Sequence, residues 1–168
     1  MIDLEPCTTM FSAEMGYWLS VLDGDPRAFA FYKRHYNYRN YKDGRRNRHG
    51  NPSRFLIMGP GNKLVLLGND ERALFGWRRG NDASQGYGVS CTIFRNEGER
   101  LSSDLIKEAD QLAWQRWPER RHFTYVNPCV VKSSNPGYCF IKAGWRKCGL
   151  TKGGLIILEI EAMGAHPQ

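Results

Sequence analysis

The feature of the sequence that most constrains the fold is an apolar stripe between Ser102 and Trp117. Its members recur at helical spacing: Leu105, Ala109, Leu112, Ala113 and Trp117. This spacing predicts an amphipathic helix that Ser102 caps and Pro118 stops. Residues 87–94, just before it, alternate in polarity and are rich in β-branched side chains, which predicts a strand. The sequence therefore predicts a strand that turns into a helix at residues 94–104.

Other segments predict further helices and strands. A rough helical spacing of apolar residues indicates a short helix within residues 1–22. Asp25 and Pro26 read as the N-cap and first residue of a helix over residues 26–41, and Gly144 as the C-cap of a brief helix over residues 135–144. Short apolar runs bounded by Gly, Pro and Asn predict the remaining strands, at residues 55–58, 64–67, 73–77, 122–126, 145–148 and 155–160.

Length and composition indicate one folded domain. A chain of 168 residues falls in the range of a single hydrophobic core, so we expect one domain over residues 1–168. Hydrophobic residues make up 41% of the chain and aromatic residues 12%, which excludes a disordered chain. Residues 162–168 are expected to form a flexible tail.

The termini and the cysteines indicate a cytoplasmic protein. The first ten residues lack the basic and apolar regions of a signal peptide, and no apolar run approaches the roughly 18 residues of a membrane span. The five cysteines are dispersed, without a C-x-x-C pair or a histidine at metal-ligand spacing. We therefore expect reduced thiols, no bound metal and no membrane partner, in the host cytoplasm if a phage encodes the protein.

Positive charge is concentrated in one segment, residues 26–54. The formal charge of the chain is +7, and nine Lys or Arg residues stand between Arg27 and Arg54 against one acid, Asp43. We expect a phosphate-bearing partner such as DNA, with phosphate contacts from Lys33, Arg34, Arg39, Arg45, Arg46 and Arg48. Tyr36, Tyr38 or Tyr41 would stack on a base. The alternative is a solvated helix face whose aromatic side, Phe29, Tyr32 and Tyr36, lies in the core.

The turn at residues 94–104 is a candidate anion site. Free backbone N–H groups and the helix dipole favour a pyrophosphate at such a turn. Arg95 and Arg100 add positive charge, and Ser102 and Ser103 add hydroxyl donors. The alternative is an ordinary helix start in which a serine caps the helix and the arginines are solvated.

Two motifs resemble the GNAT acetyltransferases. Arg95 and Gly98, between a strand and an amphipathic helix, are similar to the family's motif A, although Arg100 replaces its second glycine. Residues 140–145 (FIKAGW) are similar to a late Tyr-x-Lys-x-Gly-Phe pattern. The resemblance implies an α/β (α+β) fold of the GNAT type, with a mixed, mostly antiparallel sheet of about six strands flanked by helices. It implies an acetyl-CoA or other acyl-CoA donor at Phe94, Arg95, Asn96, Gly98, Arg100, Ser102, Ser103 and Asn135.

The proton-transfer groups are less determined. The resemblance implies that the tyrosine that often protonates the leaving thiolate corresponds to Phe140, which has no proton to donate. Tyr138 and Cys139 are the nearest substitutes, and packing is the alternative role for Tyr138. His35 is the histidine best suited to act as a base, and Glu97 is the other candidate for accepting a proton.

A narrower resemblance is to the bacteriophage Mom-type proteins, which modify adenine in phage DNA. His35-Tyr36 is similar to a His-Tyr pair in their N-terminal part, and residues 137–145 (GYCFIKAGW) to a late Gly-Tyr-x-Tyr and Ala-x-Phe pattern. The resemblance implies that the acceptor is a base amine in DNA, with His35 as base and Tyr36 shaping the pocket.

The sequence thus leaves two classes of function open. The first is an acyltransferase that moves an acyl group from acyl-CoA to an amine, on a nucleobase, a polyamine, a small amine or a protein. The second is a non-catalytic module that binds nucleic acid or protein on the same scaffold, which the loss of the tyrosine at Phe140 favours.

Overall fold

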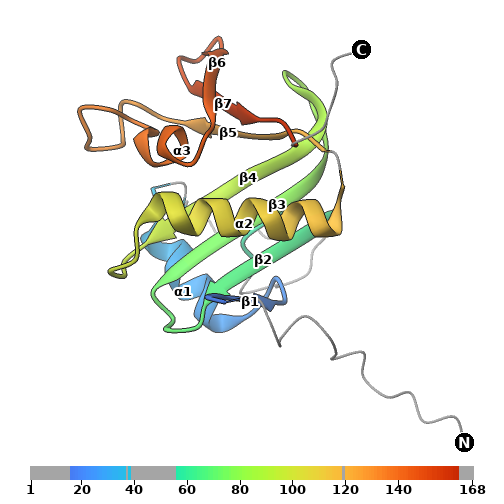
Figure 1. Ribbon diagram of the computed structural model, residues 1–168, viewed down its shortest axis with the longest axis vertical. Coiled ribbons are helices and arrows are strands. Elements are labelled where there is room, and N and C mark those ends of the chain that lie inside the picture. The colour runs from blue at the N-terminus through green and yellow to red at the C-terminus, as the bar shows by residue number, and fades with distance from the viewer. Residues whose placement is uncertain (1–15, 37, 39–55, 119, 163–168) are drawn as a thin grey trace, which may run out of the picture.

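The computed structural model describes residues 16–36, 38, 56–118 and 120–162. They form a sheet of seven strands in the order β1-β2-β3-β4-β5-β7-β6 (Figure 1). The strands are β1 (Trp18–Val21), β2 (Asn62–Gly68), β3 (Ala73–Asp82), β4 (Gly86–Asn96), β5 (His122–Val126), β6 (Arg146–Leu150) and β7 (Ile156–Ile160). Only β4 and β5 pair in parallel, because α2 (Ser102–Arg116) makes the crossover between them. The predicted mixed, mostly antiparallel sheet with flanking helices is confirmed.

Two hydrophobic clusters cover the two faces of the sheet. Alternation along β3 sends Phe75 and Trp77 to one face, where they pack with Leu105 and Ala109 of α2. Leu74 points to the other face, where it packs with Phe31 of α1 (Pro26–Arg34). Figure 1 shows α2 crossing the near face and α1 behind the sheet. The fold is therefore a sheet between helices, with β4 at its centre.

The helix ends agree with some of the predicted capping and stop signals and differ from others. Asp25 caps α1 as predicted, because its side chain accepts a hydrogen bond from the backbone N–H of Arg27. The predicted cap of α2 is wrong: Leu101 is the N-cap, Ser102 is the first helical residue, and no side chain caps the helix. The predicted stop near Pro118 is confirmed, since the helix ends at Arg116.

The last helix, α3 (Tyr138–Lys142), ends as the glycine predicts. Gly144 has a φ of 99°, which side chains disfavour, and the N–H of Trp145 bonds back to the carbonyl of Phe140 at 3.0 Å. The chain then reverses directly into β6. The helix is shorter than the predicted residues 135–144, because residues 135 and 136 form a turn before it.

Three other predicted elements differ from the structure. Residues 18–21 are a strand rather than helix, because Trp18 and Val21 pair with Gly68 and Val65 of β2. Residues 1–15 of the predicted helical segment lie outside the described residues. The helix predicted over residues 26–41 ends at Arg34, and it buries Ala28 and Phe31 instead of a Phe29, Tyr32 and Tyr36 face. The strand predicted at residues 55–58 is absent from residues 56–58, which precede β2 without regular structure.

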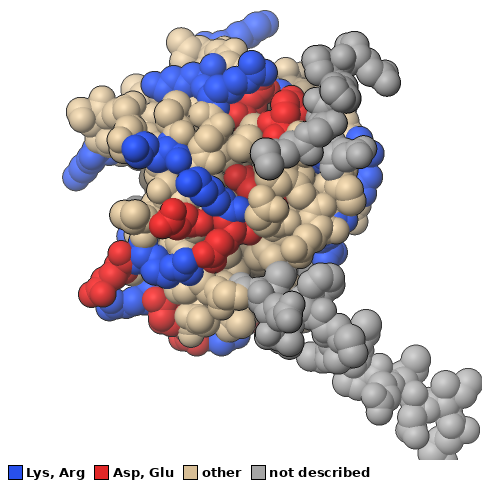
Figure 2. Space-filling view, viewed as in Figure 1, with Lys and Arg blue, Asp and Glu red and all other residues tan. Residues whose placement is uncertain are grey.

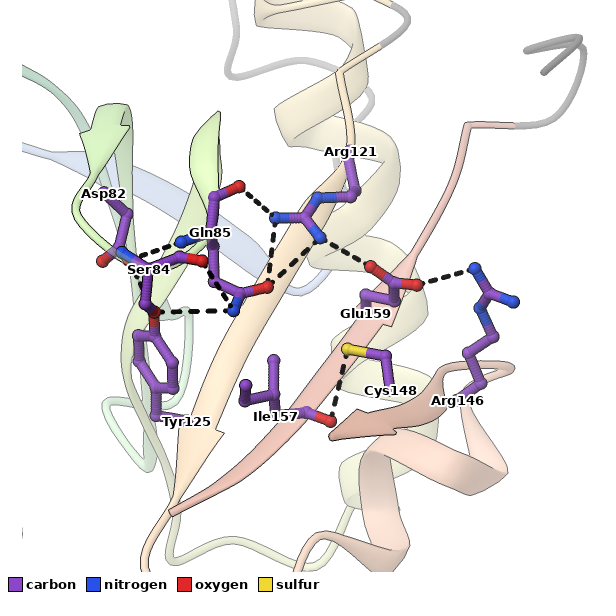
Figure 3. A network of polar contacts seen from close by, with 9 residues as sticks. All are labelled: Asp82, Ser84, Gln85, Arg121, Tyr125, Arg146, Cys148, Ile157 and Glu159. Atoms are coloured by element: carbon purple, nitrogen blue, oxygen red, sulfur yellow. Dashed lines mark hydrogen bonds and ion pairs between the residues drawn. The ribbon is translucent and has the colours of Figure 1, made fainter. Parts of the chain in front are cut away.

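A polar network joins the β3–β4 turn to the last strands (Figure 3). Glu159 of β7 accepts hydrogen bonds from Arg121 and Arg146, each at 2.6 Å, and Arg121 also donates to Gln85. In the same network the hydroxyl of Tyr125 on β5 donates to Asp82 at 2.7 Å. The network satisfies the buried carboxylate of Glu159 and fixes the Tyr125 side chain.

The surface carries both signs of charge. On the face seen in Figure 2, acidic and basic side chains alternate over the lower half, and Lys and Arg gather near β6, where Arg146 and Lys147 are exposed. The described helices include none long and apolar enough to span a bilayer. Groups of three or more potential metal ligands are likewise absent from the described residues.

Candidate functional site

A cavity of about 330 Å³ opens where β4 and β5 diverge. The parallel pairing of the two strands ends at Cys91 and Thr124, while β4 continues to Asn96. Beyond Cys91, therefore, the edge of β4 that faces β5 has no paired strand. The cavity is lined by His35, Tyr36, Cys91, Thr92, Ile93, Phe94, Arg95, Asn96, Thr124, Tyr125, Val126, Val131, Gly137, Cys139 and Phe140.

A β-bulge shapes the wall of this cavity. Gly76 pairs with Ile93 and Trp77 with Cys91, so Thr92 is an extra residue of β4 that has no partner on β3. The Thr92 hydroxyl donates to the carbonyl of Gly76 at 3.2 Å. A bulge bends its strand and takes one residue out of the ladder, which helps β4 to separate from β5 and leaves backbone polar groups beside the cavity.

The strand-to-helix turn beyond the cavity is ordered by Asn96. Its side chain accepts from the backbone N–H of Gly98 at 3.0 Å and donates to the Ser102 hydroxyl at 3.0 Å. The start of α2 has no side-chain cap, and Ser102 and Ser103 are half-buried at its first turn. An uncapped helix start with ordered flanking residues is the geometry that binds phosphate oxygens. Phe94, Arg95 and Asn96 also line the cavity, so the turn adjoins the cavity.

The two arginines of the turn pair with acids, while their side chains stay partly exposed. Arg95 Nε lies 2.5 Å from Glu97, and Arg95 Nη1 donates to the backbone carbonyl of Arg34 at 2.8 Å. Arg100 pairs with Glu108 of α2 and lies over the ring of Tyr17, with its guanidinium carbon 4.8 Å from the ring centroid. The side chain of Arg100 therefore lies against Tyr17 and Glu108.

Glu97 joins α1 to this turn. It accepts two hydrogen bonds from Arg34 at the end of α1, at 2.7 and 2.9 Å, in addition to the one from Arg95. These guanidinium groups, Arg34 first, lower the pKa of Glu97 to about 2. A carboxylate so stabilised is a weak proton acceptor, which disfavours Glu97 as the base. The bonds of Glu97 join the end of α1 to the turn, next to the residues that follow Arg34.

His35 and Tyr36 are those residues, and both line the cavity. Their rings stack with centroids 4.3 Å apart, and only 8% of His35 is exposed. Burial, and then the positive charge of Arg95, lower the pKa of His35 to about 4 against a bond to the backbone of Phe94 that raises it. The imidazole is therefore neutral at pH 7 and able to accept a proton.

The predicted residues of α3 divide between cavity and surface. Tyr138 is 50% exposed and does not line the cavity, whereas Cys139 does, and burial raises the pKa of the Cys139 thiol. Phe140 packs against Phe94 and Trp145, so it forms part of the cavity wall and the core. Asn135 is exposed in the turn before α3 and does not line the cavity.

Two described residues of the basic segment contact other side chains. Lys33 is exposed and lies over the ring of Phe29, and Arg34 pairs with Glu97. Arg39, Arg45, Arg46 and Arg48 lie outside the described residues. The prediction that this segment binds a polyanion stays a prediction.

The sequence analysis did not predict several of the residues that line the cavity. Thr124, Tyr125 and Val126 end a strand that was predicted, but nothing local indicates that β4 and β5 separate beside them. Val131 lies in the loop before α3, and Gly137 begins the helix. The one available signal was the parallel pairing expected across a helical crossover, since parallel strands that part create a cleft at their ends.

The arrangement of sheet, bulge and crossover helix defines a GNAT fold. The crystal structure of the GNAT domain of S. lividans PAT is similar to this chain with a TM-score of 0.57 and 18% identity, over 86% of this chain and 89% of that one. At this identity the likeness establishes the fold alone. No protein-family model and no curated protein matches the sequence, and the resemblance to Mom-type proteins gains no support from these comparisons.

Proposed function

We propose that the protein is an N-acyltransferase that takes an acyl group from acyl-CoA and transfers it to an amine. The observation that carries the proposal is the cavity between β4 and β5, which adjoins the uncapped start of α2 and is lined by the neutral imidazole of His35. The helix start would bind the pyrophosphate through Ser102, Ser103 and the backbone near Gly98, and the thioester would lie in the cavity.

The cavity suits acyl transfer by positioning and charge stabilisation. The amine nitrogen would attack the thioester carbonyl while His35 takes its proton. Backbone N–H groups beside the Thr92 bulge are the candidate donors to the oxyanion that forms. Holding donor and acceptor on the two sides of the parted strands supplies the orientation that such a reaction needs.

For the acceptor, we propose an amine that is uncharged at neutral pH, such as the amine of a nucleobase in DNA. None of the described residues that line the cavity is Asp or Glu, so an ammonium group would find no counter-charge there. Arg95 already disfavours a cation at His35, and Tyr36 offers a partly exposed ring for stacking. A polyamine, by contrast, needs acidic partners.

If the acceptor is a nucleobase amine, the DNA of cells that express the protein should contain a modified base. DNA from cells that express the protein is expected to contain a nucleoside of increased mass, detected by mass spectrometry of the digested DNA, and DNA from cells that express His35→Ala is not. An unchanged nucleoside profile, together with acetylation of spermidine by the purified protein, would contradict a nucleobase acceptor and leave the acyltransferase standing.

The non-catalytic module is the competing function, since Phe140 lacks the hydroxyl of the family tyrosine. Such a module would bind DNA in a salt-dependent way and have no affinity for acetyl-CoA. Calorimetric titration of acetyl-CoA separates the two proposals directly.

Filling the cavity is expected to abolish donor binding. Cys139→Trp places a large ring in the cavity wall, because Cys139 lines the cavity and is only half-buried. We expect the affinity for acetyl-CoA to fall at least about 100-fold, which is roughly 2.7 kcal/mol. Cys129→Trp is the matched control, because Cys129 is exposed and outside the cavity. Equal affinity of the two variants, measured by calorimetry, would show that the donor binds elsewhere.

A further inference from the structure

The hydroxyl groups in the cavity differ in where their protons go. Thr92 donates to the carbonyl of Gly76, and Thr124 donates to the carbonyl of Cys91 at 3.0 Å. Tyr125 donates to the carboxylate of Asp82 at 2.7 Å (Figure 3). The proton of each of these three groups is therefore committed to a protein acceptor and is unavailable to a leaving group.

Tyr36 has the opposite arrangement. Burial raises the pKa of the Tyr36 phenol, and the nearby backbone of Asn127, just after β5, partly offsets this by favouring the phenolate. No acceptor for its proton is found among the described residues. Tyr36 follows the end of α1 and lines the cavity, and 40% of the residue is exposed. A hydroxyl so held can donate into the cavity and recover its proton from solvent.

We infer that Tyr36 is the general acid that protonates the leaving thiolate, in place of the hydroxyl that Phe140 lacks. The inference rests on the proposed acyltransferase function. When the tetrahedral intermediate collapses, the carbon–sulfur bond breaks and its electron pair goes to sulfur. The proton of the Tyr36 hydroxyl goes to that sulfur, giving the free thiol and a phenolate. Water then returns a proton to the phenolate, because the Tyr36 side chain is partly exposed.

The neighbouring residue, His35, is placed to act as the base in the same reaction. His35 is stacked on Tyr36 and is neutral, so one residue takes the proton of the amine while the next gives a proton to the thiolate. Glu97 holds both by binding Arg34, the residue before them. Acid and base thus come from one segment at the end of α1, whereas Tyr138 on α3 is directed to the surface, outside the cavity.

The test compares leaving groups in Tyr36→Phe. Thiol release is measured with hydroxylamine as the amine, from acetyl-CoA and from S-(4-nitrophenyl) thioacetate, whose acidic thiol leaves without a proton. We expect Tyr36→Phe to lose about 100-fold in kcat with acetyl-CoA and less than about threefold with the aryl thioester. Tyr138→Phe is the matched control and is expected to keep the wild-type kcat with both donors.

Other outcomes would overturn the inference. An equal loss of rate with both donors would give Tyr36 a structural role only. Loss of rate in Tyr138→Phe, or in Cys139→Ala with rescue by the aryl thioester, would assign the proton to that residue instead. A calorimetric titration of the wild type separates failure of the proposed function from failure of the Tyr36 assignment. If the wild type does not bind acetyl-CoA, or binds it without releasing thiol, the protein is not an acyltransferase. If the wild type binds and turns over acetyl-CoA and Tyr36→Phe is equally active, only the assignment of Tyr36 is wrong.

Discussion

Asp110→Ala is expected to lower the free energy of unfolding by about 3–5 kcal/mol, because each of two buried donors left without an acceptor costs about 1–3 kcal/mol and the void adds to this. Asp110 of α2 is 2% exposed, and its carboxylate lies 2.7 Å from Nδ1 of His122 and 2.9 Å from Nε1 of Trp145. Burial raises the pKa of Asp110 against these two bonds. Removing the carboxylate leaves two buried N–H groups without an acceptor and a void beside them.

His122 lies in a buried, closely packed environment, so in Asp110→Ala no solvent can replace the lost hydrogen-bond acceptor. His122 is fully buried, its ring stacks on Trp114 with centroids 4.5 Å apart, and its Nε2 has no hydrogen-bond partner. Asp110, His122 and Trp145 belong to α2, β5 and the corner between α3 and β6. One carboxylate therefore joins three elements in the core of the protein.

Denaturant unfolding with linear extrapolation measures the change. Asp104→Ala is the matched control, because Asp104 is exposed on the same helix and is expected to contribute less than about 1 kcal/mol. A loss below about 1 kcal/mol in Asp110→Ala would contradict the prediction. It would mean that a water molecule or a shifted side chain satisfies His122 and Trp145.

The helix α2, the end of α3 and most of the sheet could be predicted because their signals are local. The stripe from Leu105 to Trp117 and the stop at Pro118 lie within one segment. Gly144 ends α3 because glycine readily adopts the positive φ that a helix C-terminus often needs. The strand β1 could not be predicted, since Trp18–Val21 has no alternation of its own and becomes a strand by pairing with β2, more than forty residues later.

The same distinction applies to the candidate site. Arg95, Asn96 and the start of α2 follow from a strand-to-helix pattern within ten residues. The partners that decide their chemistry are distant in sequence: Glu97 binds Arg34, Arg100 lies over Tyr17, and Tyr36 meets Asn127. The sequence indicated positive charge at Arg95 and Arg100, and only the fold determines that acids already neutralise it.

His35→Ala is expected to lower kcat about 100- to 10,000-fold while leaving acetyl-CoA binding unchanged, if His35 is the base of the proposed reaction. The neutral imidazole borders the cavity, and no other described lining residue offers a neutral nitrogen base. Because the pKa of His35 is lowered to about 4, the imidazole stays unprotonated from pH 7 down to about 5. The acid limb of the kcat profile should therefore lie near pH 4 rather than near the ordinary histidine value of about 6.5.

Glu97→Gln is the comparison that separates the two candidate bases. Its carboxylate has a pKa of about 2 and three guanidinium hydrogen bonds, so it is expected to act by holding Arg34 and to cost less than about tenfold in kcat. Thiol release from acetyl-CoA with hydroxylamine, measured between pH 4 and pH 8, reports both variants. If Glu97→Gln abolishes turnover and His35→Ala retains more than a third of it, the proton goes to the carboxylate. The imidazole would then serve to support the ring of Tyr36, on which it stacks.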